Sequence, residues 1–258
     1  MSAVISDEPD TKPGTALYVE RGGADGGPLL VLLHGMGHTA LVWRELVACL
    51  DGRGWLAVDL PGHGRSPWAG PYTFDGIAAS VAAELPPDRP VLAVGHSMGG
   101  VVALALAAAR PQVTGVLGFG IKVSWTGEEL SAMRARAARP PRVFGTEDEA
   151  QAAFLRFGGL DGLVPAGSEL SRSGVTATAG GYRLAADPAT MAVGAPDMPA
   201  LLAAVRANAG VQLARGEHDN LVTTEQLSAV DPGAVVVPAV GHNFHLTHPH
   251  LLTALLPT

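Results

Sequence analysis

The sequence predicts an α/β fold built on a mostly parallel, doubly wound sheet. Short, continuous apolar runs, typical of strands buried on both faces, alternate with longer runs that have helical spacing. This alternation implies parallel pairing through right-handed crossovers, with helices on both faces of one sheet. The chain has 258 residues, which is long for one domain and short for two. We therefore expect a single core that carries an insertion.

The strands and helices of this core can be assigned in chain order. The expected strands are residues 15–22, 28–34, 54–60, 90–96, 113–120, 211–215 and 234–240. The expected helices are residues 39–50, 74–85, 98–110, 198–209 and 248–256. Thr73 is the expected N-cap of the helix at 74–85, which the two prolines at 86–87 end.

The alternation breaks at about residue 122 and resumes near residue 191. The segment between them is rich in Arg, Gly and Ala, with helical patterns at 128–138 and 148–157 and no strand pattern. We therefore predict a small helical cap at 122–190, inserted after the strand at 113–120. The core would consist of residues 1–121 and 191–258.

Composition narrows the range of partners. The net charge of −7 argues against nucleic acid or an anionic membrane, and the longest apolar runs are too short to span a bilayer. Residues 1–14 lack the features of a secretory signal, and with Cys49 as the single cysteine no intrachain disulfide can form. We expect a cytoplasmic protein that acts on a small molecule. The sequence leaves its oligomeric state open.

A serine stands where an expected strand meets an expected helix. Gly95-His96-Ser97-Met98-Gly99 follows the pattern G-x-S-x-G, in which a strained turn lifts the serine hydroxyl out of the sheet. Ligands of open parallel sheets bind at the carboxyl ends of the strands, where Ser97 lies. The first backbone N–H of the following helix, that of Met98, is free to bind an oxyanion. Ser97 is therefore a candidate nucleophile.

A serine nucleophile needs a base, and the base needs a carboxylate to orient it. His242 follows the strand at 234–240, and Asp219 follows the strand at 211–215. The chain order Ser97, Asp219, His242 is the order expected for a nucleophile on such a turn. We predict that these three residues form a catalytic triad.

Other residues compete for these roles. The histidines near the C-terminus are His242, His245, His248 and His250, so a metal site is conceivable there, and His245 is an alternative base. Alternative acids are Glu217 and Asp231.

Further motifs resemble the α/β-hydrolase superfamily. "LLHGMG" at 32–37 resembles its His-Gly oxyanion loop, and "DLPGHGRS" at 59–66 resembles its D-x-P-G-x-G-x-S turn. The resemblance implies a hydrolase-type sheet and a second oxyanion donor at the N–H of Met36. It also implies hydrolysis of an ester, lactone or thioester through an acyl-enzyme, with no metal or cofactor. Carbon–carbon bond hydrolases and lyases share the serine, and a non-catalytic receptor is a third possibility.

The residues that contact substrate are harder to assign. The candidates are His34, Gly35, Trp125, Phe144 and Phe154. Their aromatic rings favour a lipophilic substrate. Seven arginines in the expected cap offer the alternative of an anionic substrate, although Arg is usually exposed; they are Arg134, Arg136, Arg139, Arg142, Arg156, Arg172 and Arg183.

Overall fold

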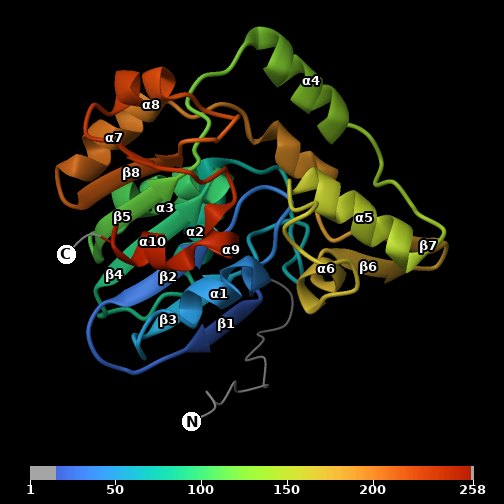
Figure 1. The fold of residues 1–258 in the computed structure, drawn as a ribbon, viewed down its shortest axis with the longest axis horizontal. Helices are drawn as coiled ribbons and strands as arrows, with labels where there is room; N and C mark the ends of the chain where they lie inside the picture. Colours follow the sequence, from blue (N-terminus) through green and yellow to red (C-terminus); the bar gives the residue numbers. More distant parts are fainter. Residues whose placement is uncertain (1–15, 257–258) are drawn as a thin grey trace.

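A computed structural model describes residues 16–256 of the chain, so the expected N-terminal segment at 1–14 lies outside the described residues. Seven strands form one sheet in the order β1-β3-β2-β4-β5-β8-β9 (Figure 1). Their bounds are β1 Val19–Gly22, β2 Leu29–Leu33, β3 Trp55–Val58, β4 Val91–His96, β5 Val113–Phe119, β8 Gly210–Gly216 and β9 Val235–Val237. Each strand expected in the core is present, with ends shifted by a few residues.

Strand pairing is parallel throughout this sheet except at one edge. β1 pairs antiparallel with β3, with Val19 opposite Val58, and the other neighbours are parallel. β2 and β4 lie in the middle and are buried along their whole length. The prediction of a mostly parallel sheet is confirmed. Because parallel strands point the same way, the segments after β2, β4, β5, β8 and β9 meet at one rim.

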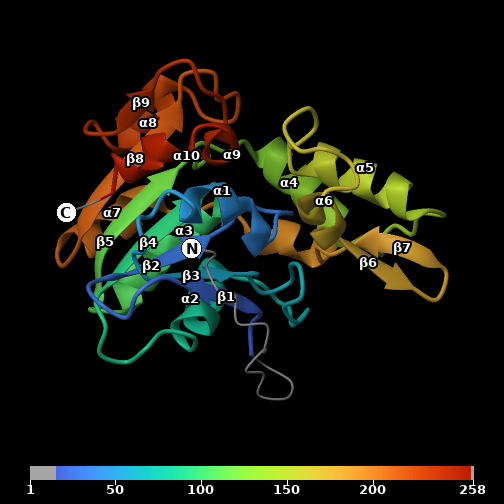
Figure 2. The same cartoon turned by 60° about the horizontal axis from the view of Figure 1, so that its bottom comes forward.

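Helices cover both faces of the sheet (Figures 1 and 2). One face carries α2 Phe74–Ala82, α3 Met98–Ala109, α7 Met198–Arg206 and α8 Thr224–Val230. The other carries the 3₁₀ helix η1 Ala40–Trp43, α1 Arg44–Val47, α9 Phe244–Thr247 and α10 Pro249–Thr253. Alternate residues of β2 point to opposite faces of the sheet. Val31 and Leu33 pack against the helices of the first face, and Leu30 and Leu32 pack against those of the second.

Two of the expected helices differ from the structure. Residues 39–50 form η1 followed by the single turn α1, and the N–H of Ala40 donates to the buried Asp59 carboxylate at 2.6 Å, which ties the start of this segment to the end of β3. Residues 248–256 contain α10, which is separate from α9 because the residue before Pro249 avoids helical dihedrals. Thr73 caps α2 as expected, accepting from the N–H of Gly76 at 3.0 Å.

The expectation that the inserted segment contains no strand is wrong. It forms α4 Gly127–Ala137, α5 Glu147–Phe157, α6 Glu169–Ser173 and a hairpin of β6 Val175–Thr178 and β7 Gly181–Leu184, followed by the 3₁₀ helix η2 Pro188–Val193. The missed signal was a β-branched run followed by Gly180-Gly181, which is typical of a tight hairpin. The segment projects to one side of the sheet (Figure 2).

The assignment of 122–190 as a separate cap stays a prediction. Within residues 16–256, no helix combines the length and apolar character needed to cross a bilayer.

Candidate active site

Ser97 lies at the turn between β4 and α3, as the sequence predicts. Its backbone has φ 51° and ψ −117°, which is an uncommon conformation for a residue with a side chain. The N–H of Ser97 donates to the carbonyl of Phe119 at the end of β5, at 2.8 Å, and this bond helps to hold the strained residue in place. The hydroxyl therefore stands at the start of a twelve-residue helix.

Two glycines allow this turn to form. A Cβ on Gly95 would overlap the carbonyl of Gly99, and a Cβ on Gly99 would overlap the carbonyl of Leu33 in β2. The start of α3 thus packs directly on the backbone of two strands, which a larger residue would prevent.

Replacing Gly99 with alanine should destabilise the fold strongly. The new methyl meets backbone rather than a movable side chain, so overpacking should lower the free energy of unfolding by about 3 kcal/mol. Urea unfolding followed by circular dichroism measures this change. Gly127→Ala is the matched control because a Cβ there has open space around it, and its midpoint should stay close to that of the unmodified chain.

The structure joins two of the predicted triad residues directly. His242 Nδ1 and Asp219 Oδ2 are 2.8 Å apart. The Asp219 side chain is completely buried, whereas the His242 side chain is 15% exposed. The other oxygen of Asp219 accepts from the N–H of Leu221 at 2.8 Å, which fixes the carboxylate. A buried carboxylate that holds Nδ1 leaves Nε2 of His242 for the substrate side.

Ser97 lies at the same rim as this pair. Gly120, which follows β5, connects them: a Cβ there would sit 3.1 Å from Nδ1 of His242 and 3.4 Å from Oδ2 of Asp219, while the preceding residue Phe119 accepts from Ser97. Among residues 16–256, no hydrogen bond joins the Ser97 hydroxyl to the His242 ring. In free enzymes this contact is often long and shortens when substrate binds.

The two residues predicted to supply oxyanion N–H groups, Met36 and Met98, lie in segments next to Ser97. Met98 is the first residue of α3, where N–H groups have no partner within the helix. Met36 lies in a turn closed by the N–H of His38, which donates to the carbonyl of Gly35 at 3.1 Å. A Cβ on Gly35 would lie 3.3 Å from the Cβ of Ser97, so this loop touches the candidate nucleophile.

The side chains of Asp59 and His34 accept hydrogen bonds from backbone N–H groups of neighbouring loops. The Asp59 carboxylate accepts from the N–H groups of Ala40 and Arg65, at 2.6 and 2.9 Å. His34 accepts from the N–H of Leu60 at 2.9 Å and is completely buried. The His34 side chain is thus held inside the core in this structure, and its place in a substrate pocket stays a prediction.

The other pocket candidates divide in a similar way. Phe144 lines two neighbouring cavities, of about 430 and 340 Å³. Phe154 is 1% exposed and packs with Leu155 and Leu160 inside the inserted segment, and Trp125 lies outside both cavities. Phe157 lines the larger cavity instead. The sequence could not show which of the two α5 phenylalanines faces open space.

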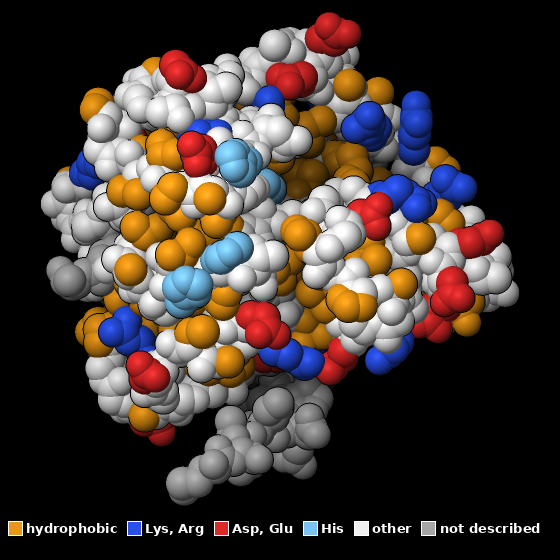
Figure 3. All heavy atoms as spheres, in the orientation of Figure 1, with side chains coloured by type: hydrophobic (Ala, Val, Ile, Leu, Met, Phe, Trp, Pro, Cys, Tyr) orange, Lys and Arg blue, Asp and Glu red, His pale blue; other side chains and the backbone are white. Residues whose placement is uncertain are grey.

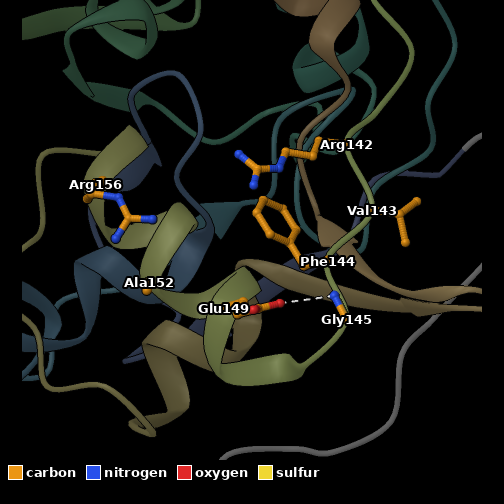
Figure 4. A pocket seen from close by; sticks show the side chains of 7 residues that line it. All are labelled: Arg142, Val143, Phe144, Gly145, Glu149, Ala152 and Arg156. Atoms are coloured by element: carbon orange, nitrogen blue, oxygen red, sulfur yellow. Dashed lines mark hydrogen bonds between the residues drawn. The ribbon is translucent and has the colours of Figure 1, made fainter.

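The larger cavity lies close to the loop that carries Met36. The ring of Phe157 covers Gly37, where a Cβ would overlap it. Leu184, Met191 and Pro188 line the cavity together with Arg136, Arg139 and Arg142. Figure 3 shows a hollow lined by hydrophobic side chains between the core and the inserted segment, with basic side chains beside it. In the smaller cavity, Arg142 and Arg156 point toward one another across α5 (Figure 4).

The C-terminal histidines do not form one group. His245 is completely buried against His96, whereas His248 and His250 are exposed. Burial lowers the pKa of His245 well below its usual value, and it makes no hydrogen bond with Asp219, which makes it a poorer base than His242. Burial also lowers the pKa of His38 to about 4 and holds that of His96 well below its usual value.

Burial of neutral histidines should make the fold sensitive to acid. Burial lowers the pKa of His63 to about 4, so as the pH falls below 6.5 the unfolded chain takes up this proton first and stability is lost toward pH 4. His63→Leu should reduce the slope of the unfolding free energy against pH by about 1.4 kcal/mol per pH unit in this range. Urea titrations from pH 7 to 4 measure the slope, and the exposed His218→Ala should leave it unchanged.

Comparison with known proteins agrees with the fold. The sequence matches the alpha/beta hydrolase family over residues 30–255, and the chain belongs to this family. Lipase LipV of Mycobacterium tuberculosis is 37% identical over 149 residues, which cover 56% of this chain and 57% of the lipase. A pimeloyl-[acyl-carrier protein] methyl ester esterase of Aeromonas hydrophila is 46% identical over 100 residues, which cover 38% of each chain. The match therefore spans about half or less of these relatives.

A solved structure covers more of the chain. E-2-(Acetamidomethylene)succinate hydrolase superposes with a TM-score of 0.74 at 28% identity, covering 92% of both chains. The esterase Rv0045c of Mycobacterium tuberculosis superposes with the same TM-score at 24% identity, which shows the common fold.

Proposed function

We propose that the chain is a serine hydrolase that cleaves a carboxylic ester, lactone or thioester with a small-to-medium, lipophilic acyl group. The observation that carries the proposal is the 2.8 Å contact of His242 with the buried Asp219, at the rim where the strained Ser97 begins α3. The relatives named as lipase and methyl ester esterase support cleavage of an ester bond.

The proposed reaction uses these residues in two halves. His242 accepts the proton of Ser97 as its oxygen attacks the carbonyl carbon, and Asp219 stabilises the imidazolium that forms. The amides of Met36 and Met98 hold the oxyanion, and His242 then donates its proton to the leaving alcohol or thiol. A water molecule, deprotonated by the same imidazole, releases the acid and restores Ser97. These steps need no metal or cofactor.

The cavity next to the Met36 loop suits the proposed acyl group. Its lining includes the apolar side chains of Phe144, Phe157, Leu184 and Met191, and its 430 Å³ lies within the usual range for small-molecule sites. Three arginines, Arg136, Arg139 and Arg142, line the same cavity. Ester panels should therefore vary both the acyl chain length and its far end, comparing a methyl with a carboxylate.

A fluorophosphonate probe tests the nucleophile directly. The purified protein should form one adduct per chain, and peptide mass spectrometry should find it on Ser97. Ser97→Ala should abolish labelling, whereas Ser124→Ala, which removes an exposed serine, should label like the unmodified chain. An adduct on another residue, or none on the folded protein, would reject the proposed nucleophile.

The ester panel separates hydrolysis from the other chemistries of the family. Release of p-nitrophenol from p-nitrophenyl esters, lost in Ser97→Ala, is the expected result. A labelled Ser97 without turnover of any ester, lactone or thioester would favour a carbon–carbon hydrolase or a lyase, in which the same residues transfer protons.

A further inference from the structure

Three histidines from separate parts of the chain meet inside the core. His38 follows β2, His96 ends β4 and His245 lies in α9, and none is more than 2% exposed. One ring nitrogen of each lies within 4.8 Å of those of the other two. The rings are in contact, with centroids 4.5 Å apart for His96 and His245 and 5.5 Å apart for the stacked His38 and His96. The proposed catalytic chemistry uses none of these rings.

Within the part of the chain that the structure describes, most of the nitrogens in this group lack a hydrogen-bond partner. They are Nδ1 of His38 and both ring nitrogens of His96 and of His245. Leaving a buried polar atom unpaired costs about 1–3 kcal/mol, and folded proteins satisfy nearly all such atoms with protein groups, water or ions. A concentration of unpaired nitrogens at one point indicates that the group has an occupant.

The remaining nitrogen of the group, Nε2 of His38, has a partner that fixes the position of the His38 proton. Nε2 of His38 lies 2.8 Å from the carbonyl oxygen of Gly158, and because a carbonyl can only accept, Nε2 carries the proton. The lone pair of His38 is then on Nδ1, which is one of the unpaired nitrogens of the group. Metal-binding histidines are commonly held in this way, with the second nitrogen donating to a backbone carbonyl.

The donors also select the kind of occupant. The group offers three imidazole nitrogens and no carboxylate oxygen. Neutral imidazoles without a carboxylate favour first-row transition metals over magnesium or calcium.

We propose that His38, His96 and His245 bind one divalent transition-metal ion of the zinc class, with a fourth position left for a water molecule. Zn–N bonds of 2.0–2.1 Å in a tetrahedral site place ligand nitrogens about 3.4 Å apart, so the rings need to move inward by about 1 Å. The site lies beside the active site rather than in it, since the rings of His96 and His242 are 4.5 Å apart.

A short loop after α5 covers the proposed site. The amide of Asn243 donates to the carbonyls of Gly158 and Gly159, at 3.1 and 2.9 Å, and His38 binds the same Gly158 carbonyl. Because none of the three rings is more than 2% exposed, we expect the folded protein to load metal slowly. Loading during refolding should be complete.

Metal content and a cobalt spectrum test the proposal. Chelator-treated protein is incubated for a day, or refolded, with Zn²⁺ or Co²⁺ and passed through a desalting column. We expect one ion per chain and, for Co²⁺, visible absorption typical of a tetrahedral site. His245→Leu and His38→Gln should each weaken binding by more than about 100-fold. Activity is not the readout, because a metal could also bind at His242.

Two controls separate this site from others. His248→Ala/His250→Ala removes an exposed pair whose rings lie 6.2 Å apart, and His242→Ala removes the proposed base. Both proteins should keep one tightly held ion. The proposal would be overturned if the unmodified chain held no more metal than a protein-free blank. It would also be overturned if the control variants lost the ion while His245→Leu kept it.

Thermal unfolding guards against a variant that merely misfolds. In chelator, His245→Leu should be at least as stable as the unmodified chain, because it removes two unpaired buried nitrogens. Zn²⁺ should then raise the unfolding temperature of the unmodified chain and leave that of the variant unchanged. Equal zinc effects on both proteins, or no effect on the unmodified chain, would show that the rings surround water instead.

Discussion

His242→Ala is expected to lower kcat for a p-nitrophenyl ester by about 10⁶-fold. Without the imidazole, no group accepts the proton of Ser97 or returns it to the leaving group. The side chain is only 15% exposed but lies at the rim of the sheet rather than in its core, so the variant should fold. Initial rates with saturating substrate, together with the unfolding midpoint, measure both effects.

Removing the nucleophile Ser97 instead of the base should leave the same residual rate. Ser97→Ala, His242→Ala and the double variant should share it, because residues that act as one unit lose their effect together. His248→Ala changes an exposed histidine nearby and should keep the full rate. A double variant much slower than either single variant would mean that the two residues act independently, which contradicts the proposed triad.

Much of the fold could be predicted because its signals are local. Runs such as residues 28–33 and 90–95 hold no polar side chain, as is typical of strands buried on both faces, and both became central strands of the sheet. The ends of helices and strands are harder to predict where a residue distant in the sequence determines them. The start of η1, for example, depends on Asp59 in the loop after β3.

The residues of the candidate site that follow the ends of strands could be predicted from the sequence. Asp219 and His242 each follow a parallel strand, and parallel strands bring such residues to one rim whatever the details of packing. Pocket residues depend instead on which side of a helix faces the core. The sequence could not show that Phe154 is buried while Phe157 borders the cavity, nor that three distant histidines meet inside the protein.

Asp219→Asn should lower kcat by about 10⁴-fold and leave the fold almost unchanged. The amide has the shape of the carboxylate and its oxygen can still accept from the N–H of Leu221, now 2.8 Å away. The group facing His242 would then be an NH₂ donor, which requires an unprotonated Nδ1 and so places the proton on Nε2. That tautomer cannot accept the proton of Ser97, and no negative charge is left to stabilise the imidazolium.

Glu217→Gln is the matched control for this substitution. Glu217 is exposed, and its carboxylate accepts from the N–H of Ala239 at 2.8 Å, which an amide oxygen can replace. It should keep nearly the full rate, because it lies outside the His242 contact. A loss of comparable size in Glu217→Gln, with Asp219→Asn still active, would make Glu217 the orienting acid and contradict the assignment on which the proposed mechanism depends.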